Sequence, residues 1–173
     1  MKTIRIILAA LTFSLLAASS YAQRVDVSAG YAFLHLNGSD GISGVNLNGF
    51  DASLGVHANS IFGVAADFGV YHGSPSGVAV TGESYTFGPR ITVPHIPKVK
   101  PFVEGLVGGS HVSAAVGGFS GSTNPFTFAF GGGADFSVAP HIAFRPQYDY
   151  FEFRTNGVIQ DSSRLVLSLV LKL

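Results

Sequence analysis

The sequence contains no cysteine and no tryptophan and has little charge, and these absences exclude whole classes of protein. Without cysteine the chain forms neither a disulfide nor a thiolate metal site. Charged residues make up 12% of the chain, against about 25% in ordinary soluble domains. Hydrophobic residues make up 47%, yet no apolar run after residue 20 reaches the roughly 18 residues that a membrane helix needs. The composition therefore excludes an ordinary soluble surface and a membrane protein built from helices.

The segment 164–173 indicates where the apolar residues belong. Leucine occupies every second position, and both charged residues, Arg164 and Lys172, fall on the other parity. Because successive side chains of a strand point to opposite faces, one face is pure leucine and needs an apolar medium. The chain also has 22 glycines and 15 phenylalanines. Together these features predict a transmembrane β-barrel, in which lipid-facing and lumen-facing residues alternate.

The first 22 residues have the features of a cleavable secretory signal peptide. Lys2 and Arg5 precede an apolar stretch over residues 6–18, and residues 20–22, Ser-Tyr-Ala, give a small-x-small cleavage pattern. We expect 1–22 to be removed and 23–173 to form one outer-membrane β-barrel domain. A retained anchor is the alternative, which the short apolar stretch disfavours. Cleavage leaves eight cations against ten acidic residues, and this mild charge argues against nucleic acid as a partner.

Eight segments with a period of two follow the signal peptide, each bounded by turn-forming residues. They are Arg24–Leu36, Leu47–Ala58, Phe62–His72, Ser84–Val93, Pro101–Ser110, Pro125–Ser137, His141–Glu152 and Arg164–Leu173. Short links alternate with longer links rich in Gly, Ser and Asn. Short periplasmic turns and longer outside loops are typical of outer-membrane barrels. The sequence therefore predicts an all-β fold, an eight-stranded antiparallel up-and-down transmembrane β-barrel in the bacterial outer membrane.

The charged residues sort as a membrane would require. Within the eight segments, all of them except Glu152, at a segment end, fall on the parity opposite to the apolar one. An Arg or Lys that faces lipid at the bilayer midplane costs about 2 to 4 kcal/mol, so lipid would impose this sorting. A soluble barrel would show the reverse. Eight strands leave an interior just wide enough for side chains, so we expect a plugged interior and not an open pore.

We predict one interior charge network that holds the barrel core closed. It consists of Asp51, Asp67, Arg90, Glu104, Asp135 and Arg145. A symmetric turn over residues 94–100 places Arg90 opposite Glu104, and the same arithmetic at the last short link brings Asp135 opposite or nearly opposite Arg145.

Two further expectations concern strand pairing. Asp51 and Asp67 are expected to approach each other, with Arg90 on the next strand beside Asp67. Pro89 and Pro146 lie inside predicted strands, where a missing N–H weakens the ladder, so we expect a β-bulge at each.

Four segments carry a family resemblance. Residues 88–90 (Gly-Pro-Arg), 101–109, 131–135 and 145–150 resemble the bacterial outer-membrane β-barrel domain family, small porin-like proteins similar to the OmpA transmembrane domain and OmpX. The resemblance implies an eight-stranded barrel in outer-membrane lipid, inserted by the barrel-assembly machinery, with a buried salt-bridge network. The chain departs from the family pattern at Leu173, where members usually end in an aromatic residue.

The sequence offers little that indicates catalysis. His111 and Ser113 form an H-x-S pair similar to that of outer-membrane lipid A deacylases. Such a hydrolase needs a carboxylate to orient its histidine. None lies between Ser113 and Ala134, and Asp135 is expected at the other end of the barrel, so we expect no enzyme. The six histidines lack ligand spacing and the glycine runs lack a phosphate-loop context, so no metal or cofactor is predicted.

We predict a structural or interaction protein, a monomer that displays loops to an extracellular partner. The loops are residues 37–46, 73–83, 111–124 and 154–163. The alternative is a small gated, porin-like channel for ions or small solutes, in which the interior charges control passage. A secreted lipid-binding barrel is a weaker alternative.

Overall fold

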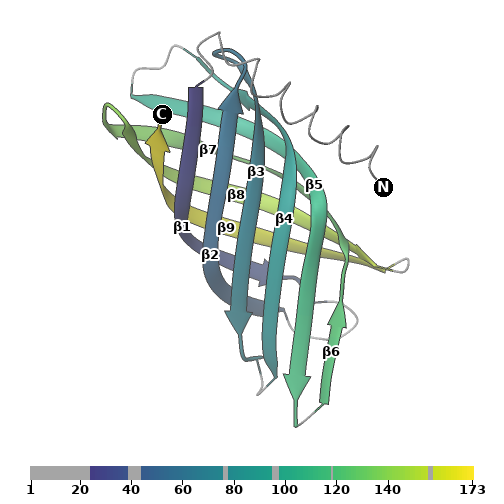
Figure 1. Ribbon diagram of the computed structural model, residues 1–173. Coiled ribbons are helices and arrows are strands. Elements are labelled where there is room, and N and C mark those ends of the chain that lie inside the picture. Colours follow the sequence, from purple (N-terminus) through teal and green to yellow (C-terminus); the bar gives the residue numbers. More distant parts are fainter. Residues whose placement is uncertain (1–23, 39–43, 76–77, 95–97, 118, 156–157) are drawn as a thin grey trace, which may run out of the picture.

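Eight long antiparallel strands close into a ring, and a ninth, short strand extends one hairpin (Figure 1). The computed structural model describes residues 24–38, 44–75, 78–94, 98–117, 119–155 and 158–173. Its strands are β1 (Arg24–Leu36), β2 (Val45–His57), β3 (Phe62–Gly73), β4 (Ala79–Thr92), β5 (Val99–Val116), β6 (Phe119–Thr123), β7 (Phe126–Ala139), β8 (Ile142–Thr155) and β9 (Val158–Lys172). They pair in the order β4-β3-β2-β1-β9-β8-β7-β5, and β4 pairs with β5 to close the ring. The predicted eight-stranded up-and-down barrel is confirmed, with β6 added along the far part of β5.

The two ends of the barrel differ in their connections (Figure 1). At the short-turn end lie the β2–β3, β4–β5 and β7–β8 turns, together with the start of β1 and the end of β9. At the long-loop end lie the remaining links, and the β5–β6 hairpin extends beyond the ring there. This alternation follows from the up-and-down order of the strands.

Four strands run three or more residues further at the long-loop end than the sequence predicts. β4 begins at Ala79, β5 reaches Val116, and β8 and β9 extend to Thr155 and Val158. The predicted loop over 154–163 is therefore mostly strand, and the predicted loop bounds were wrong. These segments contain many Ser, Thr and Val residues, and pairing them satisfies backbone N–H and C=O groups. Paired hairpins take the place of most of the predicted loops.

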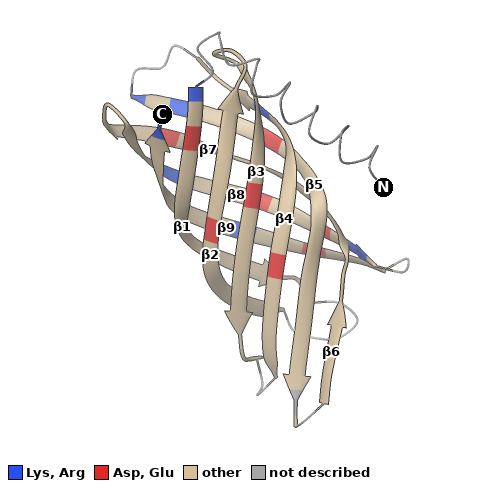
Figure 2. Cartoon of the chain, viewed as in Figure 1, with Lys and Arg blue, Asp and Glu red and all other residues tan. Residues whose placement is uncertain are grey.

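The barrel wall is apolar outside and largely polar inside. Phe50 on β2 and Leu169 on β9 are 75% and 63% exposed, while buried polar and charged residues outnumber buried hydrophobic ones. Figure 2 shows the charged positions as few and spread over the strands of the ring. A soluble domain buries its apolar residues instead. The arrangement fits a wall surrounded by hydrocarbon.

The predicted bulges at Pro89 and Pro146 do not occur. The β4–β5 register is unchanged on either side of Pro89, and Pro146 pairs opposite Leu167 without a shift. The irregularity lies instead between Ser137 and Ala139, beside the β7–β8 turn. Proline removes one N–H from the ladder, which interrupts the pairing without inserting a residue.

The predicted signal peptide, residues 1–22, lies outside the described residues and stays a prediction. Across the ranges given above, no helix is long and apolar enough to cross a membrane.

Candidate functional site

One buried arginine on β9 contacts carboxylates from three other strands. Arg164 is 0% exposed. Its Nη1 donates to Asp51 at 2.6 Å and to Asp67 at 2.8 Å, and its Nε and Nη2 donate to Asp149 at 2.9 and 2.7 Å. Nη1 also lies 3.1 Å from the Tyr71 hydroxyl. These four charged residues, which we call the Arg164 cluster, join β2, β3, β8 and β9 across the lumen.

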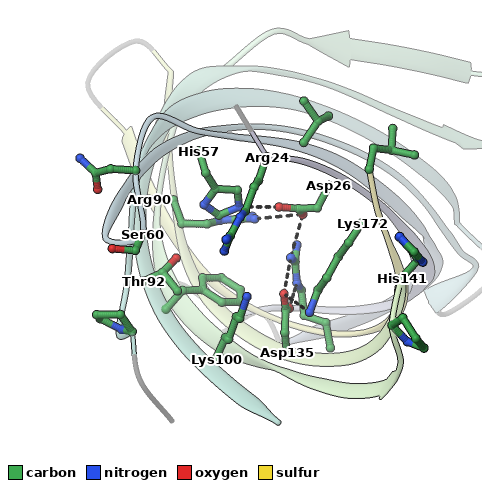
Figure 3. A pocket seen from close by; sticks show the side chains of 17 residues that line it. Arg24, Asp26, His57, Ser60, Arg90, Thr92, Lys100, Asp135, His141 and Lys172 are labelled. Carbon is green, nitrogen blue, oxygen red and sulfur yellow. Dashed lines mark hydrogen bonds and ion pairs between the residues drawn. The ribbon is translucent and has the colours of Figure 1, made fainter. Parts of the chain in front are cut away.

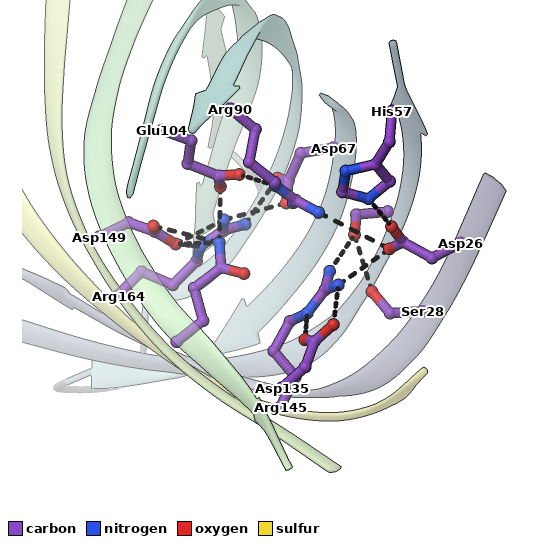
Figure 4. Close-up of polar contacts among 12 residues, drawn as sticks. Asp26, Ser28, His57, Asp67, Arg90, Glu104, Asp135, Arg145, Asp149 and Arg164 are labelled. Carbon is purple, nitrogen blue, oxygen red and sulfur yellow. Dashed lines mark hydrogen bonds and ion pairs between the residues drawn. The ribbon is translucent and has the colours of Figure 1, made fainter. Parts of the chain in front are cut away.

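A second group of ion pairs lies nearer the short-turn end, where β1 begins and β2 ends. Figure 4 shows its members beside those of the Arg164 cluster. Arg145 on β8 donates to Asp135 at 2.6 and 3.2 Å and to Asp26 at 2.8 Å. The His57 Nε2 atom lies 2.6 Å from Asp26. We call this group, with one further ion pair described next, the mouth cluster: Asp26, His57, Arg90, Glu104, Asp135 and Arg145.

Arg90 and Gln147 connect the two groups. Arg90 Nε donates to Glu104 at 2.7 Å, and Gln147 Nε2 donates to the other oxygen of Glu104 at 2.8 Å. The same amide nitrogen donates to Asp149 of the Arg164 cluster at 3.0 Å. The Phe102 ring lies 4.5 Å from the Arg90 guanidinium carbon. Hydrogen bonds therefore run without a break from Arg90 to Arg164, and an ion pair of 3.6 Å between Arg90 and Asp26 links them to the group around Arg145.

Glycines on the wall make room for these carboxylates. A Cβ atom on Gly131 would lie 2.1 Å from Asp149 Oδ1, and one on Gly55 would lie 2.6 Å from Asp26 Oδ2. A Cβ on Gly105 would meet no atom within 4 Å. Any larger residue at Gly131 or Gly55 would displace a charged side chain of the interior.

The six predicted network residues are all buried, but the structure divides them between two clusters. Arg90 lies directly across from Glu104 in the β4–β5 register, and Asp135 contacts Arg145. Asp51 and Asp67 both contact Nη1 of one arginine that was left out of the prediction.

The expected position of Arg90 beside Asp67 was wrong. Asp67 pairs opposite Thr86, and Arg90 pairs opposite Gly63, closer to the short-turn end. The register depends on where the β3–β4 hairpin turns. β4 begins at Ala79 and not at the predicted Ser84, and this difference shifts Arg90 along the barrel axis relative to Asp67.

Sequence reasoning missed four members of the clusters. Asp26, Asp149 and Arg164 are lumen-facing charges that the predicted network does not include, and neither does it include His57 at the end of β2. Parity alone placed the first three inside. Their pairing needed the β8–β9 register, in which Asp149 lies opposite Arg164.

Cavities enter the lumen from both ends. The mouth cavity, about 500 Å³, opens at the short-turn end beside Asp26, Arg90 and Arg145. The apolar cavity, about 380 Å³, lies at the long-loop end beside Leu34 and Leu47. The two share no lining residue, and the Arg164 cluster lines neither. The Arg164 cluster thus lies between the two cavities.

The structure brings a carboxylate, that of Glu83, to the strand beside His111 and Ser113. Because β4 starts at Ala79, Glu83 lies in a strand directly across from His111. Within the part of the chain that the structure describes, however, the His111 ring bonds to Asn124 at 2.7 Å and to neither Ser113 nor Glu83.

Comparisons with known proteins identify the type of barrel. A family model described as "Outer membrane protein beta-barrel domain" matches residues 6–169. No curated protein sequence matches the chain significantly.

Solved structures share the fold at low sequence identity. Neisserial surface protein A (NspA) is 18% identical with a TM-score of 0.73, and the alignment covers 86% of this chain and 97% of that one. Ail, the attachment invasion locus protein of Yersinia pestis, is 21% identical with a TM-score of 0.67, covering 87% and 99%. Ail in complex with the heparin analogue sucrose octasulfate is 20% identical with a TM-score of 0.64, and the alignment covers 87% of this chain and 99% of that one. All of these solved structures are barrels from bacteria, and at such identities the likeness establishes the fold.

Proposed function

The chain belongs to the outer membrane protein beta-barrel domain family, and from this premise we propose that it is a structural or interaction protein with a plugged lumen and displayed hairpins. Outer-membrane localisation follows from the family and from the barrels that share its fold. In the proposal, residues 1–22 are a signal peptide, the barrel-assembly machinery inserts the domain as a monomer, and lipid surrounds the apolar wall. The short-turn end faces the periplasm.

The observation that carries the plug is the Arg164 cluster, which lies between the two cavities. Arg164 spans the lumen from β9 to acids on β2, β3 and β8, and Gln147 joins this layer to Glu104 and Arg90. Opening a path would require several charge-assisted hydrogen bonds to break together in a low-dielectric interior. A steady pore is therefore unfavourable.

Planar-bilayer recording tests the plug. We expect the purified protein to give no steady conductance. The competing function, a small gated channel, is favoured by the presence of cavities at both ends, which leave only the charged layer as a barrier. Steady openings that change in Arg90→Ala would support the channel and contradict the plug.

The β5–β6 hairpin is the part of the chain best placed for contact with a partner. It extends beyond the ring, and Phe119 at the start of β6 is 82% exposed. The described hairpins at this end carry Glu83, Glu152 and Asp161, with Arg154 paired to Glu152. This mixture lacks the excess of cations that a sulfated sugar would require, so the ligand in the Ail complex is not carried over.

Labelling of introduced cysteines tests the display and the orientation. The chain has no native cysteine, so a single one reports its own position. We expect a membrane-impermeant maleimide to label Phe119→Cys on intact cells. The control Ser60→Cys, in the exposed β2–β3 turn, should label only after the outer membrane is opened. The reverse pattern would contradict the orientation.

The proposal includes no enzymatic role for His111 and Ser113. The His111 ring bonds to Asn124, and the family that the chain belongs to is defined by an outer-membrane β-barrel domain and not by an activity. Release of fatty acid from lipid A by the protein, lost in His111→Ala, would contradict this part.

A further inference from the structure

The mouth cavity at the short-turn end is lined by more cations than anions. Its acidic residues are Asp26 and Asp135. Its basic residues are Arg24, Arg90, Lys100, Arg145 and Lys172. Figure 3 shows Arg24, Lys100 and Lys172 extending from different strands toward the centre of the opening. The cavity therefore concentrates positive charge on the barrel axis.

Both acids are already engaged by neighbouring cations. Asp26 contacts Arg145 at 2.8 Å and His57 at 2.6 Å. Asp135 contacts Arg145 at 2.6 Å and lies 3.7 Å from Lys172. Among the contacts between described residues, Arg24 and Lys100 have no ion pair. Two cations of the cavity thus form no ion pair with the described residues, although Lys100 lies across from Asp135 in the β5–β7 register.

Arg90 supplies hydrogen-bond donors that the protein leaves unused. Its side chain is 2% exposed, and Nε is engaged by Glu104. Within the described ranges, neither Nη1 nor Nη2 has a hydrogen-bond partner, and the nearest ion-pair oxygen, on Asp26, lies 3.6 Å from Nη1. Buried guanidinium N–H groups are nearly always paired in folded proteins, because leaving them unpaired is unfavourable. These donors line the cavity and call for an acceptor within it.

We propose that the mouth cavity binds a soluble oxyanion of the phosphate class. The parallel Nη1 and Nη2 donors of Arg90 match two oxygens of a phosphate group, and Arg24 and Lys100 balance its charge. A doubly charged phosphate meets this excess better than a single carboxylate, and about 500 Å³ also admits a phosphate monoester. The cavity lies inside the ring of strands, whereas lipid lies outside the wall, so the ligand is a soluble species. This site depends neither on a plugged lumen nor on the displayed hairpins.

Calorimetric titration of the refolded barrel in an uncharged detergent with inorganic phosphate, at constant ionic strength, tests the proposal. We expect saturable binding of one phosphate. Arg24→Gln/Lys100→Gln should weaken the affinity at least tenfold. The matched control Lys98→Gln/Arg154→Gln removes the same charge from exposed positions outside the cavity and should leave the affinity within twofold.

Arg90→Lys keeps the charge but loses the paired donors, so it should weaken phosphate binding. The variant barrel without phosphate should still fold, which heat-modifiable electrophoresis measures. If this variant fails to fold, the Arg24/Lys100 variant decides the outcome. Absence of saturable binding, an equal loss in the control variant, or equal competition by acetate would overturn the proposal. Displacement of phosphate by phosphatidylglycerol added to the micelles would overturn the assignment to a soluble ligand.

Discussion

The two charged regions of the lumen differ in how their charges are balanced. In the Arg164 cluster one fully buried cation serves three carboxylates. In the mouth cluster Asp26 and Asp135 each have a second cationic or histidine neighbour besides Arg145. Strand parity places both groups inside the barrel. The Arg164 cluster has no cation besides Arg164, whereas the mouth cluster borders a cavity that is also lined by Arg24, Lys100 and Lys172. The first region is suited to holding strands together, and the second to accepting an anion.

Removal of Arg164 should have the largest effect. Arg164→Met leaves three buried carboxylates without their cation, and breaking a buried ion pair from one side costs about 3 to 5 kcal/mol. We expect a loss of that size in the free energy of unfolding, measured by urea titration of barrels folded into lipid vesicles. Arg154→Met removes an exposed arginine paired with Glu152 and should change it by less than about 1 kcal/mol. Equal losses in both variants would contradict the central role of Arg164.

Arg145→Met should have a smaller effect, at the low end of the same range, about 3 kcal/mol. Asp26 keeps His57 at 2.6 Å and Asp135 keeps Lys172 at 3.7 Å, so neither acid is left alone. The same urea titration gives the comparison. A loss that exceeds that of Arg164→Met would reverse the contrast between the two regions.

Gly131→Ala tests the space around the Arg164 cluster. The added methyl group would lie 2.1 Å from Asp149 Oδ1 and 2.4 Å from the Tyr148 carbonyl oxygen. Overpacking of this kind costs about 1 to 3 kcal/mol. Gly105→Ala is the matched control, because its methyl group meets no atom within 4 Å. If the two variants unfold at the same urea concentration, close packing at Gly131 does not support the cluster.

The sequence was sufficient for the fold because each strand carries its own signal. The two sides of the wall can be read from the alternation of residues: leucine takes one parity of residues 164–173, and acids take the opposite parity in other strands. β1 also has the bounds that its pattern predicts. Arg90 and Glu104 were also placed correctly across from each other, since their turn is short. Local periodicity and short turns are the information that one sequence holds reliably.

The rest depended on distances that periodicity does not contain. The register of Asp149 and Arg164 depends on how far β8 and β9 continue past the membrane, and the predicted loop over 154–163 hid that extension. The contact between His57 and Asp26 joins strands through the β1–β2 hairpin, whose link was also predicted too long. Which charges meet across the lumen depends on the register of every hairpin between their strands. Predicting the start of β4 at Ser84 and not at Ala79 was therefore enough to misplace Arg90.

The position of Arg164 on β9 links charge balance to the order of assembly. β9 pairs with β1 along the seam that joins the two sequence-distant sides of the sheet, with Arg164 opposite Leu34. The β8–β9 hairpin already places Arg164 opposite Asp149, but Asp51 on β2 and Asp67 on β3 lack this counter-ion until β9 pairs with β1. Before that step the sheet has unpaired edges and two carboxylates without a cation, which are unfavourable in hydrocarbon. The pairing of β9 with β1 therefore both closes the barrel and neutralises its interior charges. An intermediate in which these strands are unpaired enters the bilayer less favourably.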